Sequence, residues 1–345
     1  MKITYISDKL VKKEIFEAAI RRHFDFIDTL QIEGFQVDWP EIPLQYGPEV
    51  REFVGTEEEV ISLIADAEVF LTHVAPVTER VLASAPRLKV IGCARGGPVN
   101  INVNAATMRG IPVFYNPGRN APVVAEFTVG LILAEVLNIA RAHTALINGI
   151  WRGDYYIYEN TGFELEGKIA GIIGLGAVGR RVAHLLKAFG MRILAFDPYV
   201  SEDVFTACGA EKVSLEMLLK NADVVTLHAR HTPETAKIIN NRTLALMKPT
   251  AYFVNTARGG LVDYEALYKS LKDKKIAGAA LDVFDEEPIP PNSTVFSLDN
   301  VTITPHIGGA SKETAFRSAD ILVAEVKKFL LGQPVQFCKN PEVLN

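Results

Sequence analysis

The sequence predicts an α/β fold built from two blocks of parallel strands and helices, followed by one further helix. Short β-branched runs alternate with helical patterns over the first 110 residues, and the alternation repeats more regularly from Lys168 onward. A glycine-rich turn follows the first strand of the second block. A chain of 345 residues suits about two domains, and one that is 48% hydrophobic and 22% charged has the composition of a globular protein.

Charge and cysteine usage argue against several classes of protein. A net charge of −5 argues against a nucleic acid or an anionic membrane as the main partner. Cys93, Cys208 and Cys338 are odd in number, far apart and without CxxC spacing, so we expect no disulfide framework and no metal site. The same cysteine pattern makes a reducing cytoplasm the expected location.

Neither a targeting segment nor a membrane span is expected. The first residues, MKITYISDKL, hold one short apolar burst followed by charge, which is unlike a signal peptide. The longest apolar stretch, Val123–Ala140, is interrupted by Glu126, Glu135 and Asn138, whereas a bilayer span needs about 20 nearly uncharged residues. We therefore expect this stretch to form a buried core or interface helix.

The first block contains alternating strands and helices around one proline-rich segment. Apolar, β-branched runs predict strands at Ile3–Ile6, Val69–Leu71 and Leu88–Ile91. Apolar spacing of three and four predicts helices at Lys9–Arg21, Glu57–Ala65 and Val103–Arg109. The stretch Trp39–Gly55 holds Pro40, Pro43 and Pro48, and it is predicted to be a surface loop.

A dense turn cluster, Asn116–Asn120, separates the blocks, and Ala121-Pro122 opens the long apolar helix. From Lys168 onward the sequence predicts six strands, as a dinucleotide-binding sheet requires. They are Ile169–Ile173, Arg192–Phe196, Val224–Leu227, Tyr252–Asn255, Ala279–Asp282 and Val301–Ile303. A final amphipathic helix, Lys312–Leu331, is expected to return to the first block, which makes that domain discontinuous (1–117 plus 310–345) around a domain spanning 118–309.

The glycine-rich turn reads Gly174-Leu-Gly176-Ala177-Val178-Gly179 and runs into helical spacing over Arg180–Phe189. Gly174 suits a tight turn, Gly176 lets backbone amides reach a pyrophosphate, and Gly179 lets helix and strand approach closely. With a strand before it and a helix after it, this GxGxxG pattern predicts a dinucleotide-binding turn.

Asp197 ends the next strand, at the distance where dinucleotide-binding domains place an acidic residue. Its carboxylate can accept hydrogen bonds from both adenosine ribose hydroxyls and would repel a 2′-phosphate, which favours NAD over NADP. The alternative is that Asp197 only caps the turn before Pro198 and that the glycines are ordinary turn residues. Arg180, in the first helical turn, is equally consistent with a pyrophosphate contact and with a surface charge.

Three polar residues follow strands of this sheet and match the needs of a nicotinamide-dependent oxidoreductase acting on a hydroxyl group. His306 follows the last strand and suits the base that takes the hydroxyl proton. Arg258 could hold a carboxylate and the adjoining carbonyl with its planar guanidinium, and Glu287 could pair with His306. Singly, each has a plainer interpretation, as a turn residue, a surface charge or part of a solvated acidic loop. Their combination beside a dinucleotide motif favours catalysis.

Four motifs resemble those of the D-isomer-specific 2-hydroxyacid dehydrogenases, and most closely their D-3-phosphoglycerate dehydrogenase-like members. They are Gly174–Gly179, Asn255–Gly259, Leu281–Pro288 and Thr304–Gly309, and the similarity extends to Asn100, Gly110–Pro117 and Glu126. The resemblance implies a Rossmann-type NAD-binding domain and a flavodoxin-like discontinuous substrate domain, with the active site in a cleft between them. It also implies hydride transfer between NAD and a D-2-hydroxy acid or 2-oxo acid.

Residue by residue, the resemblance makes His306 the acid/base, Glu287 its partner and Arg258 the substrate anchor. It implies that Asp282 accepts a hydrogen bond from the nicotinamide carboxamide. It assigns a loop to the substrate carboxylate and further residues to the cofactor: Arg95, Gly96 and Gly97 in the loop, and Ala177, Val178, His228, Thr256, Ala257 and His306 at the cofactor. It also implies a homodimer joined through the helix Pro122–Ile147, and a chain without the C-terminal regulatory domain of longer phosphoglycerate enzymes.

Three positions depart from the family pattern. Thr72, followed by His73, stands where phosphoglycerate enzymes commonly carry an arginine, and a phosphate normally needs fixed cations or several amides. Arg95 stands where small residues are usual, and it could contact a second acidic group of the substrate or be a surface charge. Arg230 replaces the usual proline near the cofactor ribose, and the sequence leaves open whether it contacts cofactor phosphates or distal substrate.

Three other functions fit part of the pattern. One is D-3-phosphoglycerate dehydrogenase proper, against which Thr72 argues. A second, of another class, is an NAD-sensing scaffold like the C-terminal-binding corepressors, which is disfavoured because the sequence shows no long appended tail and no basic face. The third is formate dehydrogenase, in which the histidine pairs with a glutamine, whereas residue 287 here is a glutamate.

Overall fold

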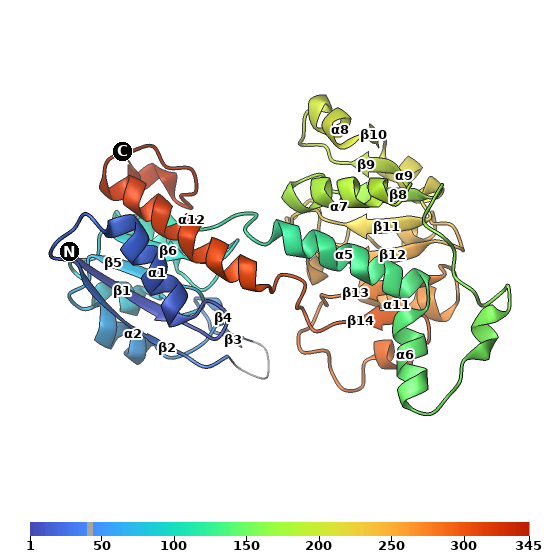
Figure 1. The fold of residues 1–345 in the computed structure, drawn as a ribbon, viewed down its shortest axis with the longest axis horizontal. Coiled ribbons are helices and arrows are strands. Elements are labelled where there is room, and N and C mark those ends of the chain that lie inside the picture. The colour runs from blue at the N-terminus through green and yellow to red at the C-terminus, as the bar shows by residue number, and fades with distance from the viewer. Residues whose placement is uncertain (40–43, 345) are drawn as a thin grey trace. The chain divides into compact units, whose positions relative to one another are not determined.

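The computed structural model describes residues 1–39 and 44–344, and it divides into two compact units (Figure 1). Unit 1 comprises Met1–Asn120 and Ala310–Asn345, and unit 2 comprises Ala121–Gly309. The sequence places the first boundary three residues earlier, after residue 117, and the second at the same point. Each unit contains its own parallel sheet, so the predicted α/β class is confirmed.

The unit 1 sheet has the strand order β2-β1-β5-β6-β7, and all neighbouring strands are parallel. This is the flavodoxin-like order, in which the chain winds outward in both directions from the first strand. The strands in chain order are β1 (Lys2–Ser7), β2 (Gln31–Gln36), β5 (Val69–Thr72), β6 (Val90–Cys93) and β7 (Val113–Phe114).

Two strands of this sheet were not predicted. β2 is a polar edge strand and β7 has only two residues, so neither shows an apolar run. The predicted loop Trp39–Gly55 also contains a short antiparallel pair, β3 (Gln45–Tyr46) with β4 (Arg51–Phe53), and the loop prediction is wrong there. Residues 40–43 of that stretch, including Pro40 and Pro43, lie outside the described residues.

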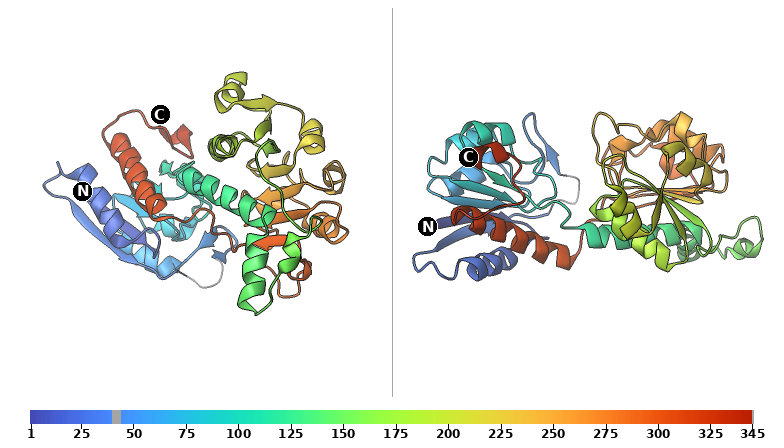
Figure 2. Two further views of the ribbon diagram at one scale, coloured as in Figure 1. Left: turned by 45° about the vertical axis from the view of Figure 1, so that its right-hand side comes forward. Right: turned by 90° about the horizontal axis from the view of Figure 1, so that it is seen from above.

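Helices cover both faces of the unit 1 sheet. The C-terminal helix α12 lies beside α1 on one face, where Phe16, Ile20 and Leu322 share a core with the strands, and Figure 2 shows the two helices side by side. Helices α2, α3 and α4 pack on the opposite face. The helical segments are α1 (Lys13–Phe24), α2 (Glu57–Ile64), α3 (Glu79–Ala83), α4 (Val103–Met108), α12 (Lys312–Leu330) and the 3-10 turn η4 (Pro341–Leu344).

Helix α1 begins four residues later than the predicted Lys9. The carboxylate of Asp8 accepts hydrogen bonds from the backbone amides of Leu10 and Val11, at 2.7 and 2.9 Å. A side chain that captures neighbouring amides competes with helix formation, so the chain after β1 turns before the helix starts. This turn leaves Asp8 buried at the end of β1.

The unit 2 sheet has the order β10-β9-β8-β11-β12-β13-β14 and is parallel throughout. It contains the Rossmann order 3-2-1-4-5-6 with one more strand beside the last. The strands are β8 (Ile169–Ile173), β9 (Arg192–Phe196), β10 (Ala210–Lys212), β11 (Val224–Leu227), β12 (Tyr252–Asn255), β13 (Gly278–Leu281) and β14 (Val301–Ile303). The prediction missed β10, an edge strand of three residues with no apolar run.

Two apolar cores enclose the unit 2 sheet. One face is covered by α5 and α7, with Ile132, Val182 and Leu186 at its centre, and the other by α9, α10 and α11. The helical segments are α5 (Ala121–Val136), α6 (Ile139–Ile147), η1 (Gly153–Tyr156), α7 (Ala177–Ala188), α8 (Glu202–Cys208), α9 (Leu215–Asn221), α10 (Asn241–Leu244), η2 (Gly259–Leu261), α11 (Tyr264–Lys272) and η3 (Thr294–Ser297).

The predicted single helix Pro122–Ile147 is wrong, because the chain breaks into α5 and α6 with a bend of 66°. Asn138 adopts φ 59° at the break. The buried carboxylate of Glu135 accepts hydrogen bonds from Arg141 of α6 and Thr302 of β14, both at 2.6 Å, and so holds α6 in its bent direction. No single helix in the described chain is long and apolar enough to cross a membrane, although α5 and α6 together reach that length and composition.

Replacing Leu322 with alanine tests whether α12 is part of the unit 1 core. Leu322 is fully buried and would contact a side chain at Gly92 of β6. We expect Leu322→Ala to lower the free energy of unfolding by about 2–5 kcal/mol, measured by urea denaturation, because it leaves a cavity. Phe316→Ala, at a position of the same helix that is 59% exposed, is the control. Equal stability of both variants would contradict the packing described.

Candidate active site

The glycine turn between β8 and α7 has a separate steric reason for each glycine. Gly174 has φ +94°, and a Cβ there would lie 2.5 Å from the amide nitrogen of Ala229. A Cβ at Gly179 would lie 2.1 Å from the carbonyl oxygen of Gly174, so helix and turn touch directly. A Cβ at Gly176 would meet nothing within 4 Å. The amides of Ala177 and Val178 begin α7 and donate to none of the described residues, so these amides and the open space beside Gly176 fit a pyrophosphate.

Asp197, directly after β9, is tied to this turn. Its Oδ2 accepts a hydrogen bond from the amide of Leu175 at 2.7 Å, and its Oδ1 accepts one from the amide of Tyr199 at 2.9 Å. The turn-capping role is therefore present, yet each carboxylate oxygen keeps capacity for a ribose hydroxyl. Arg180 donates through Nε to the carbonyl of Leu175 at 3.0 Å and thus helps to hold the turn.

Three further residues assigned to the cofactor lie at neighbouring strand ends. His228 follows β11. Its backbone lies close to Gly174, because a Cβ added to Gly174 would lie 2.7 Å from the carbonyl carbon of His228. Burial lowers the pKa of His228 to about 3, so the ring is neutral, and it shares a 3.0 Å hydrogen bond with Thr226. After β12, the hydroxyl of Thr256 lies 2.8 Å from that of Thr128 in α5, and Asn255 Oδ1 accepts from the Ala257 amide.

The structure brings Glu287 and His306 together. They follow β13 and β14, which are neighbours in the sheet, and His306 donates through Nδ1 to Glu287 Oε2 at 2.7 Å. The other carboxylate oxygen of Glu287 accepts from the amide of Phe284 at 2.9 Å. Burial raises the pKa of Glu287, but the contacts with His306 and Phe284 and the charge of Arg258 lower it overall, so the carboxylate is ionised. His306 itself is exposed.

Asp282 holds the loop that carries His306, a function that sequence analysis missed. Its buried carboxylate accepts hydrogen bonds from the Thr304 hydroxyl at 2.7 Å and from the amides of Ile307 at 2.9 Å and Gly308 at 2.8 Å. His306, between these donors, has φ 53°. The position of Asp282 at the end of β13 was a usable signal, because strand-end carboxylates commonly bind nearby amides.

Arg258 follows β12, the neighbour of β13, in a turn that is held by side-chain hydrogen bonds. The amide group of Asn255 donates to the carbonyl of Arg258 and to the Tyr264 hydroxyl, both at 3.2 Å. The side chain of Arg258 is exposed, and its Nη1 donates to the carbonyl of Ala257 at 2.7 Å. Four of its five N–H groups thus make no hydrogen bond to the described residues, so the guanidinium can bind a carboxylate.

In unit 1, the loop Arg95–Gly97 after β6 presents backbone amides. The amides of Gly96 and Gly97 donate to none of the described residues, and a Cβ at Gly97 would meet nothing within 4 Å. Successive unpaired amides of this kind suit an anion. The side chain of Arg95 is engaged by Glu52: it donates to the Glu52 carbonyl at 2.7 Å and pairs with the Glu52 carboxylate.

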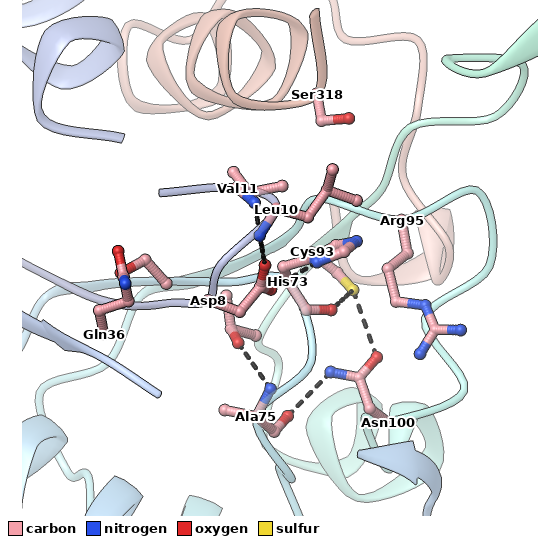
Figure 3. A network of polar contacts seen from close by, with 12 residues as sticks. Asp8, Leu10, Val11, Gln36, His73, Ala75, Cys93, Arg95, Asn100 and Ser318 are labelled. Atoms are coloured by element: carbon pink, nitrogen blue, oxygen red, sulfur yellow. Dashed lines mark hydrogen bonds and ion pairs between the residues drawn. The ribbon is translucent and has the colours of Figure 1, made fainter. Parts of the chain in front are cut away.

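A second histidine network in unit 1 was not recognised in the sequence (Figure 3). His73, after β5, donates through Nδ1 to Asp8 Oδ2 at 2.6 Å, and Arg119 donates to its Nε2 at 3.1 Å. Sequence analysis noted His73 but neither partner, although Asp8 directly follows a strand. In the described part of the chain, no cluster of three or more His, Cys, Asp or Glu residues could hold a metal ion.

Comparisons with known proteins agree with this architecture. The family model for the D-isomer specific 2-hydroxyacid dehydrogenase NAD binding domain matches residues 129–308. D-3-phosphoglycerate dehydrogenase of Methanocaldococcus jannaschii is 46% identical over 281 residues, covering 81% of this chain and 52% of that protein, so the chain spans about half of that relative's length. Glyoxylate reductase of Thermofilum pendens is 40% identical, covering 86% of this chain and 88% of that protein. D-lactate dehydrogenase of Aquifex aeolicus, solved with NAD and lactic acid, is 29% identical with a TM-score of 0.70, covering 99% and 97% of the two chains.

The neutral, partly buried ring of His228 predicts a pH dependence of stability. Between about pH 6.5 and pH 3 the unfolded chain binds a proton at this residue and the folded chain does not, so stability is lost as the pH falls, by at most about 1.4 kcal/mol per pH unit. His228→Gln should flatten the pH dependence of the free energy of unfolding between pH 7 and pH 5. The exposed His184, replaced in the same way, is the control. Identical slopes for the wild type and His228→Gln would be evidence against a lowered pKa of this ring in the folded protein.

Proposed function

The chain belongs to the D-isomer specific 2-hydroxyacid dehydrogenase family, and we propose that it is an oxidoreductase that transfers a hydride between NAD and the C2 carbon of a D-2-hydroxy acid or 2-oxo acid. One observation carries this proposal: His306, after β14, contacts Glu287, after β13, and the neighbouring strand β12 ends close to Arg258. A proton-transfer group and a carboxylate anchor thus stand at the edge of a dinucleotide-binding sheet.

His306 handles the proton in this proposal. Because Nδ1 donates to the ionised Glu287, Nε2 is the ring atom left to exchange a proton with substrate. In 2-oxo acid reduction Nε2 gives its proton to the carbonyl oxygen, and in the reverse direction it takes the hydroxyl proton. Glu287 acts as a positioning residue, since it stabilises the protonated ring and keeps its orientation.

The remaining residues bind and orient. The glycine turn with Asp197 would hold NAD, together with His228, Thr256, Ala257 and Asp282 at the neighbouring strand ends. Arg258 would hold the substrate carboxylate and the adjoining carbonyl in bidentate fashion. The loop of unit 1 that carries Arg95, Gly96 and Gly97 would bind substrate through its free amides.

We propose a non-phosphorylated 2-oxo acid as the principal substrate, with D-3-phosphoglycerate as the alternative. The relatives from Methanocaldococcus jannaschii and Thermofilum pendens support the reaction class, and their names differ in the substrate. Thr72 supplies no cation where phosphoglycerate enzymes commonly carry an arginine, which favours the first choice.

A homodimer in the cytoplasm completes the proposal. Exposed apolar and aromatic side chains follow one another along α6 and the segment after it, at Leu146, Ile147, Trp151, Tyr156 and Tyr158. Such a patch is unusual on a monomer and is typical of an interface. The three cysteines are all free, in keeping with a reducing compartment.

Replacing His306 with asparagine tests the acid/base assignment. Asparagine cannot exchange the proton, so we expect kcat to fall at least ~10²-fold while the affinity for NADH stays close to that of the wild type. Steady-state kinetics with a panel of 2-oxo acids and fluorescence titration with NADH measure the two quantities. His184→Asn, at an exposed position of α7, serves as the control. A variant that keeps most of its activity would show the assignment to be wrong.

Replacing Ile147 with aspartate tests the dimer. Ile147 is 70% exposed at the end of α6, and a carboxylate there would be buried without a partner in an interface. Sedimentation velocity should give a dimer for the wild type and a monomer for Ile147→Asp. Met217→Asp, on α9 of the same unit and 49% exposed, should remain a dimer. A monomeric wild type, or a dimeric Ile147→Asp, would refute this interface.

A further inference from the structure

Arg119 of unit 1 carries a charge that no carboxylate among the described residues contacts. Its Nη1 donates to the Ser318 hydroxyl at 2.7 Å and its Nη2 to His73 Nε2 at 3.1 Å. Its Nε is buried and has no acceptor in the described chain. Burial and the nearby charge of Arg95 lower the pKa of Arg119 to about 10, which still leaves it protonated at neutral pH. One N–H group on Nη1 and one on Nη2 therefore have no partner among the described residues and can bind an anion.

His73 determines where this guanidinium lies. The ring donates through Nδ1 to Asp8 Oδ2 at 2.6 Å, so its Nε2 is the acceptor for Arg119. Burial lowers the pKa of His73, which keeps the ring neutral with this donor and acceptor arrangement. Asp8 is in turn held by two backbone amides, and Figure 3 shows it beside His73, with Ser318 of α12 on one side of the group. The side chain of Arg119 is thus held from two directions.

This group lies at the carboxyl edge of the unit 1 sheet, where open parallel sheets bind ligands. Asp8 follows β1, His73 follows β5, and Arg119 lies in the turn after β7. The amide of Asn116, in the same turn, donates to the carbonyl of Arg95 at 2.7 Å. The turn that carries Arg119 is therefore bonded directly to the loop whose free amides suit a carboxylate.

Arg95 is the less suitable cation of the two. Its Nη1 donates to the backbone carbonyl of Glu52, and its Nη2 pairs with the Glu52 carboxylate. A guanidinium that already has a carboxylate partner gains little from a second anion, because the first pair must be broken or shared. The cation that the sequence assigned to Arg95 is supplied more readily by Arg119.

We propose that Arg119 determines substrate specificity by binding a second anionic group, a carboxylate or a phosphate, of a 2-oxo acid whose first carboxylate binds the amides of Gly96 and Gly97. The proposal rests on the oxidoreductase function proposed above. Charge-assisted hydrogen bonds to an anion are about twice as strong as neutral ones, so a substrate with a second anionic group gains affinity that a simple 2-oxo acid lacks.

The test compares three 2-oxo acids that differ in the second group: glyoxylate has none, oxaloacetate has a carboxylate and 3-phosphohydroxypyruvate has a phosphate. We expect Arg119→Met to lower kcat/KM for a dianionic substrate about 10- to 100-fold and for glyoxylate less than threefold. A loss confined to oxaloacetate or to 3-phosphohydroxypyruvate identifies the group that binds. Arg119→Lys should recover part of the loss, and Arg22→Met, at an exposed site on α1, should behave as the wild type. Equal loss for all three substrates, or no loss, overturns the proposal.

Calorimetric binding in the presence of NAD⁺, where a 2-oxo acid cannot be reduced, separates this proposal from the proposed function. Selective, Arg119-dependent binding of oxaloacetate or 3-phosphohydroxypyruvate without any turnover would reject the oxidoreductase function and support the role of Arg119. Turnover of glyoxylate, together with binding of the dianionic substrates that Arg119→Met does not change, would support the oxidoreductase function and reject the role of Arg119. If Arg119→Met melts well below the wild type, Arg119→Lys takes its place in the test. Lysine keeps the charge but lacks the planar guanidinium, so we expect a smaller loss of kcat/KM that is still selective for the dianionic substrates.

Discussion

The buried carboxylate of Asp282 holds the loop from which the proposed proton transfer takes place. Three donors from Thr304, Ile307 and Gly308 converge on its two oxygens, and His306 lies between them. A non-glycine residue at φ 53° is strained by about 1–3 kcal/mol, and these charge-assisted hydrogen bonds offset that cost. The loop then directs Nδ1 of the imidazole to Glu287, so the whole arrangement depends on a carboxylate from the neighbouring strand.

Each unit pairs an imidazole with a carboxylate at the carboxyl edge of its own parallel sheet. Nδ1 of His73 meets Asp8 at 2.6 Å in unit 1, and Nδ1 of His306 meets Glu287 at 2.7 Å in unit 2. The difference between them is exposure, because His73 is buried against Arg119 whereas His306 is exposed. The same pairing therefore fixes a hydrogen-bond acceptor in unit 1, and in unit 2 it orients the imidazole that we propose transfers the proton.

Features that depend on local sequence were predicted well. The glycine turn follows from the close contacts of Gly174 and Gly179, and the central strands follow from their apolar runs. The errors fall where local pattern is weak: the edge strands β2 and β10 are polar or very short. The break between α5 and α6 was missed because it involves the partners of the buried Glu135, one of which lies 167 positions later in the chain.

The sequence by itself determined the two α/β blocks, the dinucleotide turn and the strand ends that carry Arg258, Glu287 and His306, because periodicity and glycine sterics act over a few residues. Only the tertiary structure decided which charges are neutralised. Arg95 meets Glu52 from 43 positions earlier, whereas Arg119 meets His73 and Ser318 and contacts no carboxylate in the described chain. Strand order and helix packing determine these partners by bringing distant segments together, so local sequence patterns do not predict them.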